Sequence, residues 1–275
     1  MDRPLEYVVV LSADDPVAQA LRPVWGTPPA LVPGPDGAPI RALAPGVGLL
    51  QRPGLHIADD ALRVPPHRTG DPPPTLVFPS VHRSAGQRET LTVHPLGNPG
   101  PTADVGGRPG ALVLTDPRRM TDTLRRAAEL AEQIGWPATF EATHHGPALE
   151  QPAYFVEIGA ADYAHPPEPA VRGFARLLPG IRPDPADRIA IGLGGGHYAP
   201  HFTELALERH WAFGHVLPDH ALSVGGAPLV ESALRNTPDS LGALYHRARD
   251  AEAAPWCTSV RRCRDNEAPR RTEGG

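Results

Sequence analysis

The sequence predicts an α/β fold, with a twisted, mainly parallel mixed sheet and helices on both faces. Short apolar runs rich in β-branched residues recur along the chain, segments with helical spacing alternate with them, and Gly and Pro separate the two kinds. This alternation favours parallel strands because each parallel connection needs a crossover, usually a helix. At 275 residues the chain can bury one large core.

The N-terminal part is predicted to consist mainly of strands and loops. Residues 5–11 are the first strand, and residues 12–16 supply a helix N-cap followed by a proline suited to the first turn. Residues 26–46 are expected to be loop. The proline-rich stretches 59–74 and 95–110 are predicted connections. Further strands are predicted over 47–51, 55–58, 75–78 and 89–94.

The C-terminal part alternates between helix and strand. Asp116 and Pro117 open the clearest helix, and Gly135 ends it. Strands are predicted over 138–143, 154–159, 189–193 and 211–217, and helices over 169–178, from Thr203 and over 229–253. No domain boundary is visible, so we expect residues 1–263 to form a single α/β domain and 264–275 a disordered tail.

Composition limits the classes of partner. The net charge is −5, so no global positive field attracts nucleic acid. All 26 basic residues are arginine. No apolar run is long enough to span a membrane, and the start lacks the layout of a signal peptide. Two cysteines without a C-x-x-C pattern favour a reducing compartment. We therefore predict a cytoplasmic protein with no membrane association and no evident protein partner.

Three segments rich in glycine and proline carry histidines next to predicted strands. They are residues 143–147, 194–200 and 214–218, and their histidines are His144, His145, His197 and His215. Imidazole at the end of a buried strand can present a base or a metal ligand to a crevice. One such segment would more simply be a turn, but three of them with Glu157 in between favour an active site. We expect the four histidines to share one crevice at the C-terminal ends of the strands.

Standard cofactor and hydrolase motifs are missing. The run from Gly192 fails the dinucleotide pattern because His197 occupies its sixth position and Pro200 interrupts the following helix. A phosphate-binding loop of the Walker type needs a lysine, and the chain has none. Neither an H-E-x-x-H helix nor a G-x-S-x-G elbow occurs.

Six segments, in this order, closely resemble the archaeal and plant type of D-aminoacyl-tRNA deacylase. The similarity runs from about residue 5 to about residue 220, and the segments are 78–84, 91–98, 141–147, 155–159, 192–203 and 214–218. The resemblance implies a fold related to peptidyl-tRNA hydrolases and nucleoside phosphorylases. It also implies zinc as cofactor and hydrolysis of the ester that links a D-amino acid to the 3′ end of a tRNA.

The chain departs from the family pattern at positions expected to face phosphate. Val81, His201 and Asp219 stand where the family favours basic residues, and His220 replaces a usual tyrosine. Because phosphate contacts supply much of the affinity for nucleic acid, an alternative substrate is a small aminoacyl ester or amide of a specialised biosynthetic pathway. If tRNA is bound, other arginines must compensate. The candidates are Arg118, Arg119, Arg125, Arg126, Arg261 and Arg262.

The residues leave two hydrolytic mechanisms open. In one, His144, His145, His197 and His215 hold zinc, with Glu157 as ligand or general base. In the other, a histidine is the base, Thr143 is a positioning hydroxyl or nucleophile, and backbone N–H groups form the oxyanion site. The family resemblance favours zinc. Structural roles for the histidines, and a non-catalytic binding protein, are the blander alternatives. The residues predicted to bind substrate are His82, His94, Gly194, Gly195, Gly196 and Tyr198.

Overall fold

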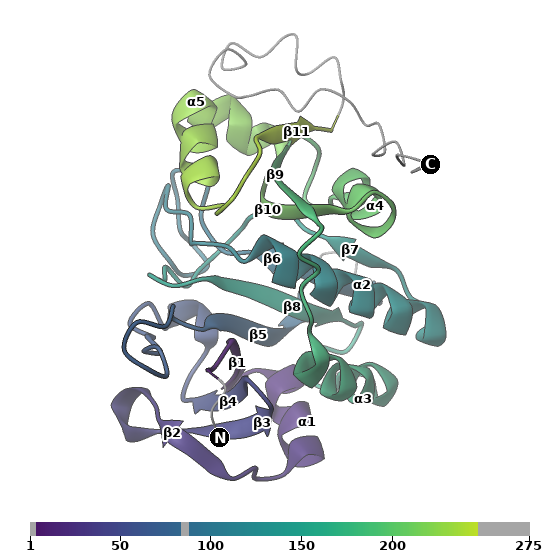
Figure 1. The fold of residues 1–275 in the computed structure, drawn as a ribbon. Helices are drawn as coiled ribbons and strands as arrows, with labels where there is room; N and C mark the ends of the chain where they lie inside the picture. Colours follow the sequence, from purple (N-terminus) through teal and green to yellow (C-terminus); the bar gives the residue numbers. More distant parts are fainter. Residues whose placement is uncertain (1–3, 84–87, 247–275) are drawn as a thin grey trace, which may run out of the picture.

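The structure is a computed structural model that describes residues 4–83 and 88–246. Eight strands form one sheet in the order β2–β3–β4–β1–β5–β8–β6–β7, and three form a second sheet in the order β10–β9–β11. Figure 1 shows the strands stacked in this order, from β2 at the bottom to the small sheet near the top. Parallel pairs predominate, which confirms the predicted α/β class with a mainly parallel sheet.

The elements have the following bounds. The large sheet contains β1 (Tyr7–Ser12), β2 (Ala30–Pro33), β3 (Pro39–Ala44), β4 (Val47–Arg52), β5 (Thr75–His82), β6 (Thr90–Pro95), β7 (Ala138–Phe140) and β8 (Ala153–Gly159). The small sheet contains β9 (Arg188–Leu193), β10 (Trp211–Leu217) and β11 (Ala243–Tyr245). The helices are α1 (Pro16–Trp25), α2 (Pro117–Ile134), α3 (Glu168–Leu177), α4 (Pro200–Glu208) and α5 (Asp219–Arg235).

Several predicted elements differ from the structure. The expected loop 26–46 contains β2 and β3, an antiparallel pair at the edge of the sheet, where proline is tolerated because outward N–H groups need no partner. The expected strand 55–58 is a 3₁₀ turn at His56–Ala58. The helix expected over 229–253 ends at Arg235, and β11 follows it. The predicted tail lies outside the described residues, so the domain bounds stay a prediction.

Two aspartates fix the starts of α1 and α2. Asp15 accepts hydrogen bonds from the backbone N–H groups of Val17 and Ala18, at 2.9 and 3.1 Å. Asp116 accepts from the backbone N–H and the Nε of Arg119 and also from the Thr75 hydroxyl, at 2.7 Å for the last. The second cap therefore also joins α2 to the start of β5.

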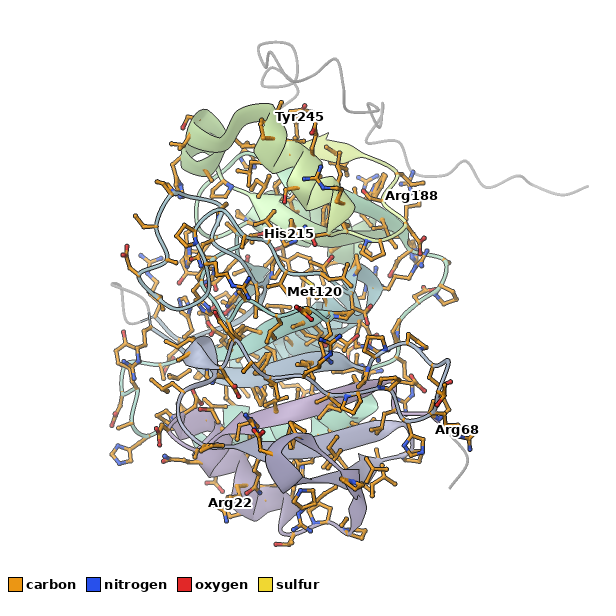
Figure 2. The ribbon with its side chains drawn as sticks, turned by 90° about the vertical axis from the view of Figure 1, so that its left-hand side faces the viewer. Arg22, Arg68, Met120, Arg188, His215 and Tyr245 are labelled. Carbon is orange, nitrogen blue, oxygen red and sulfur yellow. The ribbon has the colours of Figure 1, made fainter. Side chains whose placement is uncertain are left out.

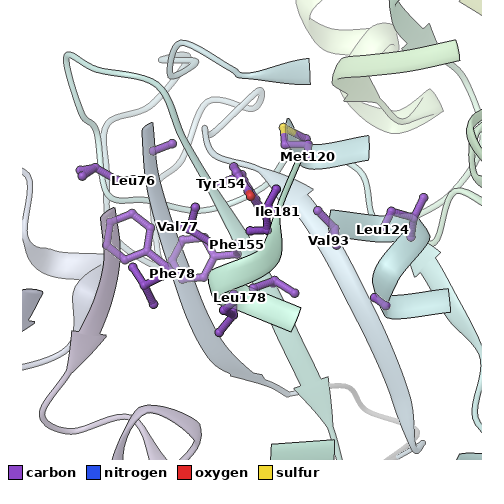
Figure 3. Packing of buried hydrophobic residues seen from close by; sticks show 14 of the residues in the cluster. Leu76, Val77, Phe78, Val93, Met120, Leu124, Tyr154, Phe155, Leu178 and Ile181 are labelled. Atoms are coloured by element: carbon purple, nitrogen blue, oxygen red, sulfur yellow. The ribbon is translucent and has the colours of Figure 1, made fainter. Parts of the chain in front are cut away.

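The helices and the central strands meet on one face of the large sheet. Helices α1, α3 and α2 pack beside one another in that order (Figure 1). The Tyr154 hydroxyl on β8 lies 2.8 Å from the Thr123 hydroxyl on α2, so Tyr154 points to the helices. Neighbouring residues of a strand point to opposite faces, so Phe155 and Glu157 point away from them. The ring of Phe155 stacks on that of Phe78 at 5.1 Å, as Figure 3 shows.

The small sheet is covered on both faces. On one face, Phe213 of β10 packs against Phe202 of α4 with ring centroids 5.1 Å apart. On the other, Ile191 and Leu193 of β9 pack with Leu229 of α5 in a second apolar cluster. Helix α2 contacts both β6 and β10, so it joins the two sheets.

We predict that Asp116→Ala destabilises the protein by about 2 kcal/mol, because it removes both a helix cap and a buried link to Thr75. Urea unfolding followed by circular dichroism measures the change. Glu132→Ala, an exposed substitution on the same helix, serves as the control and should stay within about 0.5 kcal/mol. Equal stabilities of the two variants would contradict the role assigned to the cap.

Candidate functional site

Three neighbouring strands place polar side chains on the face of the large sheet that points away from the helices. Glu157 of β8 pairs with Ser80 of β5 on one side and with Thr92 of β6 on the other. His82 and His94 lie two residues beyond these partners, so the pleat puts them on the same face. Strand β6 runs antiparallel to β8, so the two histidines reach Glu157 from opposite directions. The site therefore lies across the sheet face, and its histidines stand at or shortly after the C-terminal ends of β5, β6, β7 and β9, as the sequence predicted for His144, His145 and His197.

The segment after β7 brings further histidines over this face. Glu141, His144 and His145 follow β7 directly, and the backbone of Ala142 donates a 2.8 Å hydrogen bond to the carbonyl of His197. The ring centroids of His144 and His197 lie 4.7 Å apart. Segments more than fifty residues apart in the sequence are thus joined in one cluster, which we call the histidine cluster: His82, His94, His144, His145 and His197.

Glycines hold His145 in an unusual backbone conformation. His145 has φ of 41°, which non-glycine residues rarely adopt. Its carbonyl accepts from the backbone N–H of Gly97 at 2.8 Å. A Cβ atom on the next residue, Gly146, would lie 2.2 Å from the backbone nitrogen of Gly107. Only glycine fits at this position, because the backbone of the loop around Gly107 packs directly against Gly146.

Two glutamates form the acidic centre of the histidine cluster. Glu157 lies 3.1 Å from His82 Nδ1 and 3.7 Å from His94 Nε2. Glu141 lies 3.3 Å from His82 Nδ1, 3.4 Å from His197 Nε2 and 4.0 Å from His144 Nε2. Both glutamates are buried. The Nδ1 of His82 faces both carboxylates, so a proton on this nitrogen would compensate their charge.

Backbone carbonyls fix the proton positions of three histidines. The Nδ1 atoms of His94, His144 and His145 lie 3.2, 2.8 and 2.7 Å from the carbonyls of Pro95, Ala142 and Gly146. A carbonyl only accepts, so each Nδ1 carries the proton and each Nε2 keeps a lone pair. This is how metal-binding histidines are commonly oriented by their second nitrogen.

The donor set fits a metal ion. Both carboxylate oxygens of Glu141 and the Nε2 of His94 are buried and have no hydrogen-bond partner among the described residues. Buried polar atoms without partners are costly and rare, so a bound cation would explain them. At this site, three overlapping groups each bring three ligand atoms within 4.8 Å of one another. They are His94, His144 and His145; His82, Glu141 and His197; and His94, Glu141 and Glu157. Neutral imidazoles with a carboxylate are ligands that zinc prefers.

Burial sets the charge states of the site. Burial, and secondarily His94, lowers the pKa of His145 to about 4, and burial with its neighbours holds the pKa of His144 well below its usual range. Both are therefore neutral near pH 7. Burial opposes ionisation of Glu157, but its contacts with His82 and His94 outweigh this and lower its pKa. For His82, Glu157 and Glu141 outweigh burial and raise the pKa.

A pocket of about 380 Å³ opens on this cluster. Glu157 and the histidines His82, His144, His145 and His197 line it, together with Leu55, Ile57, Val81 and Val105 as apolar walls. Four polar residues that the sequence did not single out for the site also line it: Asp15, His56, Ser80 and Arg83. Glu141, the other residue missed, is a carboxylate within the predicted strand 138–143, three residues before His144. Ser80 and Arg83 lie in the 78–84 segment that carries the family resemblance, whereas Asp15 and His56 carry no pattern that points to the site.

Other predicted site residues lie elsewhere. His215 is fully buried in the interior of the molecule (Figure 2). Its Nδ1 lies 3.1 Å from the Thr143 hydroxyl and its Nε2 lies 2.9 Å from the carbonyl of Val113. The Thr143 hydroxyl also accepts from the backbone N–H of Val216 at 3.1 Å. These contacts satisfy both side chains, and the structure does not bring His215 into the histidine cluster.

The glycine-rich segment lies beside the cluster and does not line the pocket. The backbone N–H of Gly194 donates to the carbonyl of Leu217 at 2.8 Å, so it is not available to an oxyanion. Gly195 is partly exposed and Gly196 is exposed. The Tyr198 hydroxyl lies 3.0 Å from His82 Nε2. This contact orients the His82 ring, whose other nitrogen faces the two glutamates.

Known proteins share this sequence and fold. The family described as D-aminoacyl-tRNA deacylase matches residues 69–262. Relatives of that name are 38% identical in Thermoplasma acidophilum (62% of this chain, 67% of the relative) and 32% identical in Thermococcus kodakarensis (76% and 78%). In Methanococcoides burtonii the match is 38% identical but spans only 34% of the relative.

A crystal structure of a conserved protein of unknown function matches with TM-score 0.71 and 25% identity, over 87% of this chain and 85% of that one. Among the described residues, no helix combines the length and the apolar character that a membrane crossing requires.

We predict that His215 makes stability depend on pH. Burial lowers its pKa to about 4 in the folded protein, whereas an exposed histidine has a pKa of about 6.5. The unfolded chain therefore binds the proton more readily, and stability is lost as pH falls from 6.5 towards 4, by roughly 3 kcal/mol from this residue. Urea unfolding at pH 7 and pH 4 should show a smaller loss in His215→Gln than in the wild type. The exposed His165→Gln is the control, and an unchanged pH dependence in His215→Gln would contradict the assignment.

Proposed function

Because the chain belongs to the D-aminoacyl-tRNA deacylase family, we propose that it hydrolyses the ester between a D-amino acid and the 3′ end of a tRNA. The observation that supports this most strongly is the histidine cluster around Glu141 and Glu157, because four of its histidines and Glu157 line a pocket. An activated ester needs a water molecule, a group that takes its proton, and stabilisation of the oxyanion. The pocket contains groups for each task.

We propose zinc as the cofactor. His94, His144 and His145 would hold one ion through their Nε2 lone pairs, and His82, Glu141 and His197 supply a second group of ligands. Support comes from the unpartnered oxygens of Glu141 and from the neutral imidazoles. When bound, zinc supplies Lewis-acid polarisation of the ester carbonyl and a lowered pKa of water.

Glu157 is the proposed general base. It lines the pocket, and His82 holds its carboxylate at 3.1 Å, so it is ionised and oriented when a water molecule enters. The apolar side chains Leu55, Ile57 and Val105 would receive the amino-acid side chain and exclude bulk water.

A second candidate substrate is a small aminoacyl ester or amide. The observation in its favour is that the arginines of α2 bind Asp116, Asp122 and Asp187 of this chain and do not line the pocket. They are therefore not free to bind the phosphates of a tRNA. The tRNA substrate implies a cytoplasmic enzyme, in agreement with the prediction from the sequence.

One comparison tests the proposed function. Purified protein is incubated with D-phenylalanyl-tRNA, L-phenylalanyl-tRNA and a small D-phenylalanyl ester, each with and without a chelator. We expect hydrolysis of the D-aminoacyl-tRNA, a lower rate on the L form, and loss of activity with the chelator. Hydrolysis of the small ester alone would favour the second candidate, and no hydrolysis of any ester would contradict both.

We predict that His145→Ala and Glu157→Gln each lower kcat/KM for D-aminoacyl-tRNA by roughly a hundredfold or more, because each removes a ligand or the base. Circular dichroism and urea unfolding check that both variants fold. His165→Ala, on an exposed loop, is the matched histidine control. Wild-type rates in folded His145→Ala or Glu157→Gln would remove these residues from the mechanism.

A further inference from the structure

Arg83 is a cation at the edge of the pocket, and the proposed hydrolysis does not use it. It directly follows His82, the last residue of β5, and its exposed side chain lines the pocket. Adjacent Cα atoms are about 3.8 Å apart, so Arg83 begins next to the histidine cluster. Among the pocket-lining residues, it is the one with a permanent positive charge, since the others are neutral, acidic or histidine.

The other arginines considered for nucleic-acid contact are committed to internal partners. Arg118 donates to the carbonyl of Asp187, and Arg125 binds the Asp187 carboxylate at 2.6 and 2.8 Å. Arg119 is bonded to Asp116 at 2.9 Å, and Arg126 to Asp122 at 2.7 Å. Arg261 and Arg262 lie outside the described residues. Helix α2 therefore does not offer the free cationic face that the sequence allowed.

Arg83 has a different environment. Its guanidinium carbon lies 5.9 Å from the centroid of the Tyr163 ring, and within the described part of the chain it has no carboxylate within ion-pair distance. A ring under the guanidinium orders the side chain without neutralising it, which lowers the entropy lost when an anion binds. The Arg83 guanidinium is therefore ordered and positively charged, so it can bind an anion from outside the protein.

The pocket itself needs such a cation. Asp15 and Glu157 line it and Glu141 lies at the histidine cluster, so an approaching phosphate would meet negative charge. In an aminoacylated tRNA the nearest phosphate is attached to the 5′ oxygen of the same ribose that carries the ester. With the ester over the histidine cluster, this phosphate is one ribose away, towards the edge of the pocket.

We propose that Arg83 binds a phosphate group of the substrate, the one attached to the aminoacylated nucleoside. The proposal rests on the proposed function and identifies the substrate class more closely, as an aminoacyl ester of a nucleotide. A guanidinium presents paired N–H groups to phosphate oxygens, which a neutral side chain cannot reproduce.

Two small substrates test this directly. One is 3′-O-D-phenylalanyl-adenosine 5′-monophosphate, and the other is the same ester without the phosphate. We expect the wild type to prefer the phosphate-bearing ester by roughly tenfold or more in kcat/KM, and Arg83→Gln to lose this preference. Arg83→Lys should keep part of it. With D-aminoacyl-tRNA, Arg83→Gln should make the dependence of KM on salt shallower, by close to one in the logarithmic slope.

Arg22→Gln is the matched control, because Arg22 is exposed on α1 at the opposite end of the molecule from Tyr245 (Figure 2). It should retain the wild-type preference. Equal rates on the two esters in the wild type, or a preference that survives in Arg83→Gln, would overturn the proposal while leaving the hydrolase intact. Failure of the wild type to cleave any D-aminoacyl ester would instead overturn the proposed function.

Discussion

Two buried carboxylates, Glu141 and Glu157, constrain the rest of this structure. Removing an ionised carboxylate from water costs several kcal/mol unless opposite charge or hydrogen bonds replace the lost hydration. Glu157 obtains this from His82, whereas the oxygens of Glu141 have imidazoles at 3.3 to 4.0 Å but no hydrogen bond among the described residues. The strands that carry these residues must keep their register, because a slip by one residue would turn the polar side chains to the helix-facing side.

The surrounding backbone orients the imidazoles of the histidine cluster. Three of them donate Nδ1 to a carbonyl one or two residues away, which leaves Nε2 as an acceptor. At His145 this arrangement depends on a backbone with positive φ. The backbones of Gly146 and Gly107 pack against each other there, and a side chain on Gly146 would prevent this contact. The loop between β6 and α2 therefore shapes the site, although no member of the histidine cluster lies on this loop.

The sequence predicted the elements that rely on local pattern, and it missed those that rely on distant contacts. Helix α2 has its cap, its apolar spacing and its terminal glycine in one stretch, so its bounds agree closely with the prediction. His144, His145 and His197 stood out through neighbouring glycine, and they lie together. His215 has the same local pattern, yet Thr143 and Val113, which satisfy its ring, come from other parts of the chain. Asp15 and His56 join the pocket only through the tertiary fold, which no short motif near them indicates.

We propose that the histidine cluster and Glu141 form a metal centre with nitrogen and oxygen ligands. The decisive measurement is X-ray absorption at the zinc edge of the purified, zinc-loaded protein. We expect a first shell of nitrogen and oxygen at about 2.0 to 2.1 Å with imidazole scattering beyond it, and a weakened signal in Glu141→Ala. A first shell containing sulfur at about 2.3 Å, or a spectrum identical in Glu141→Ala, would contradict it.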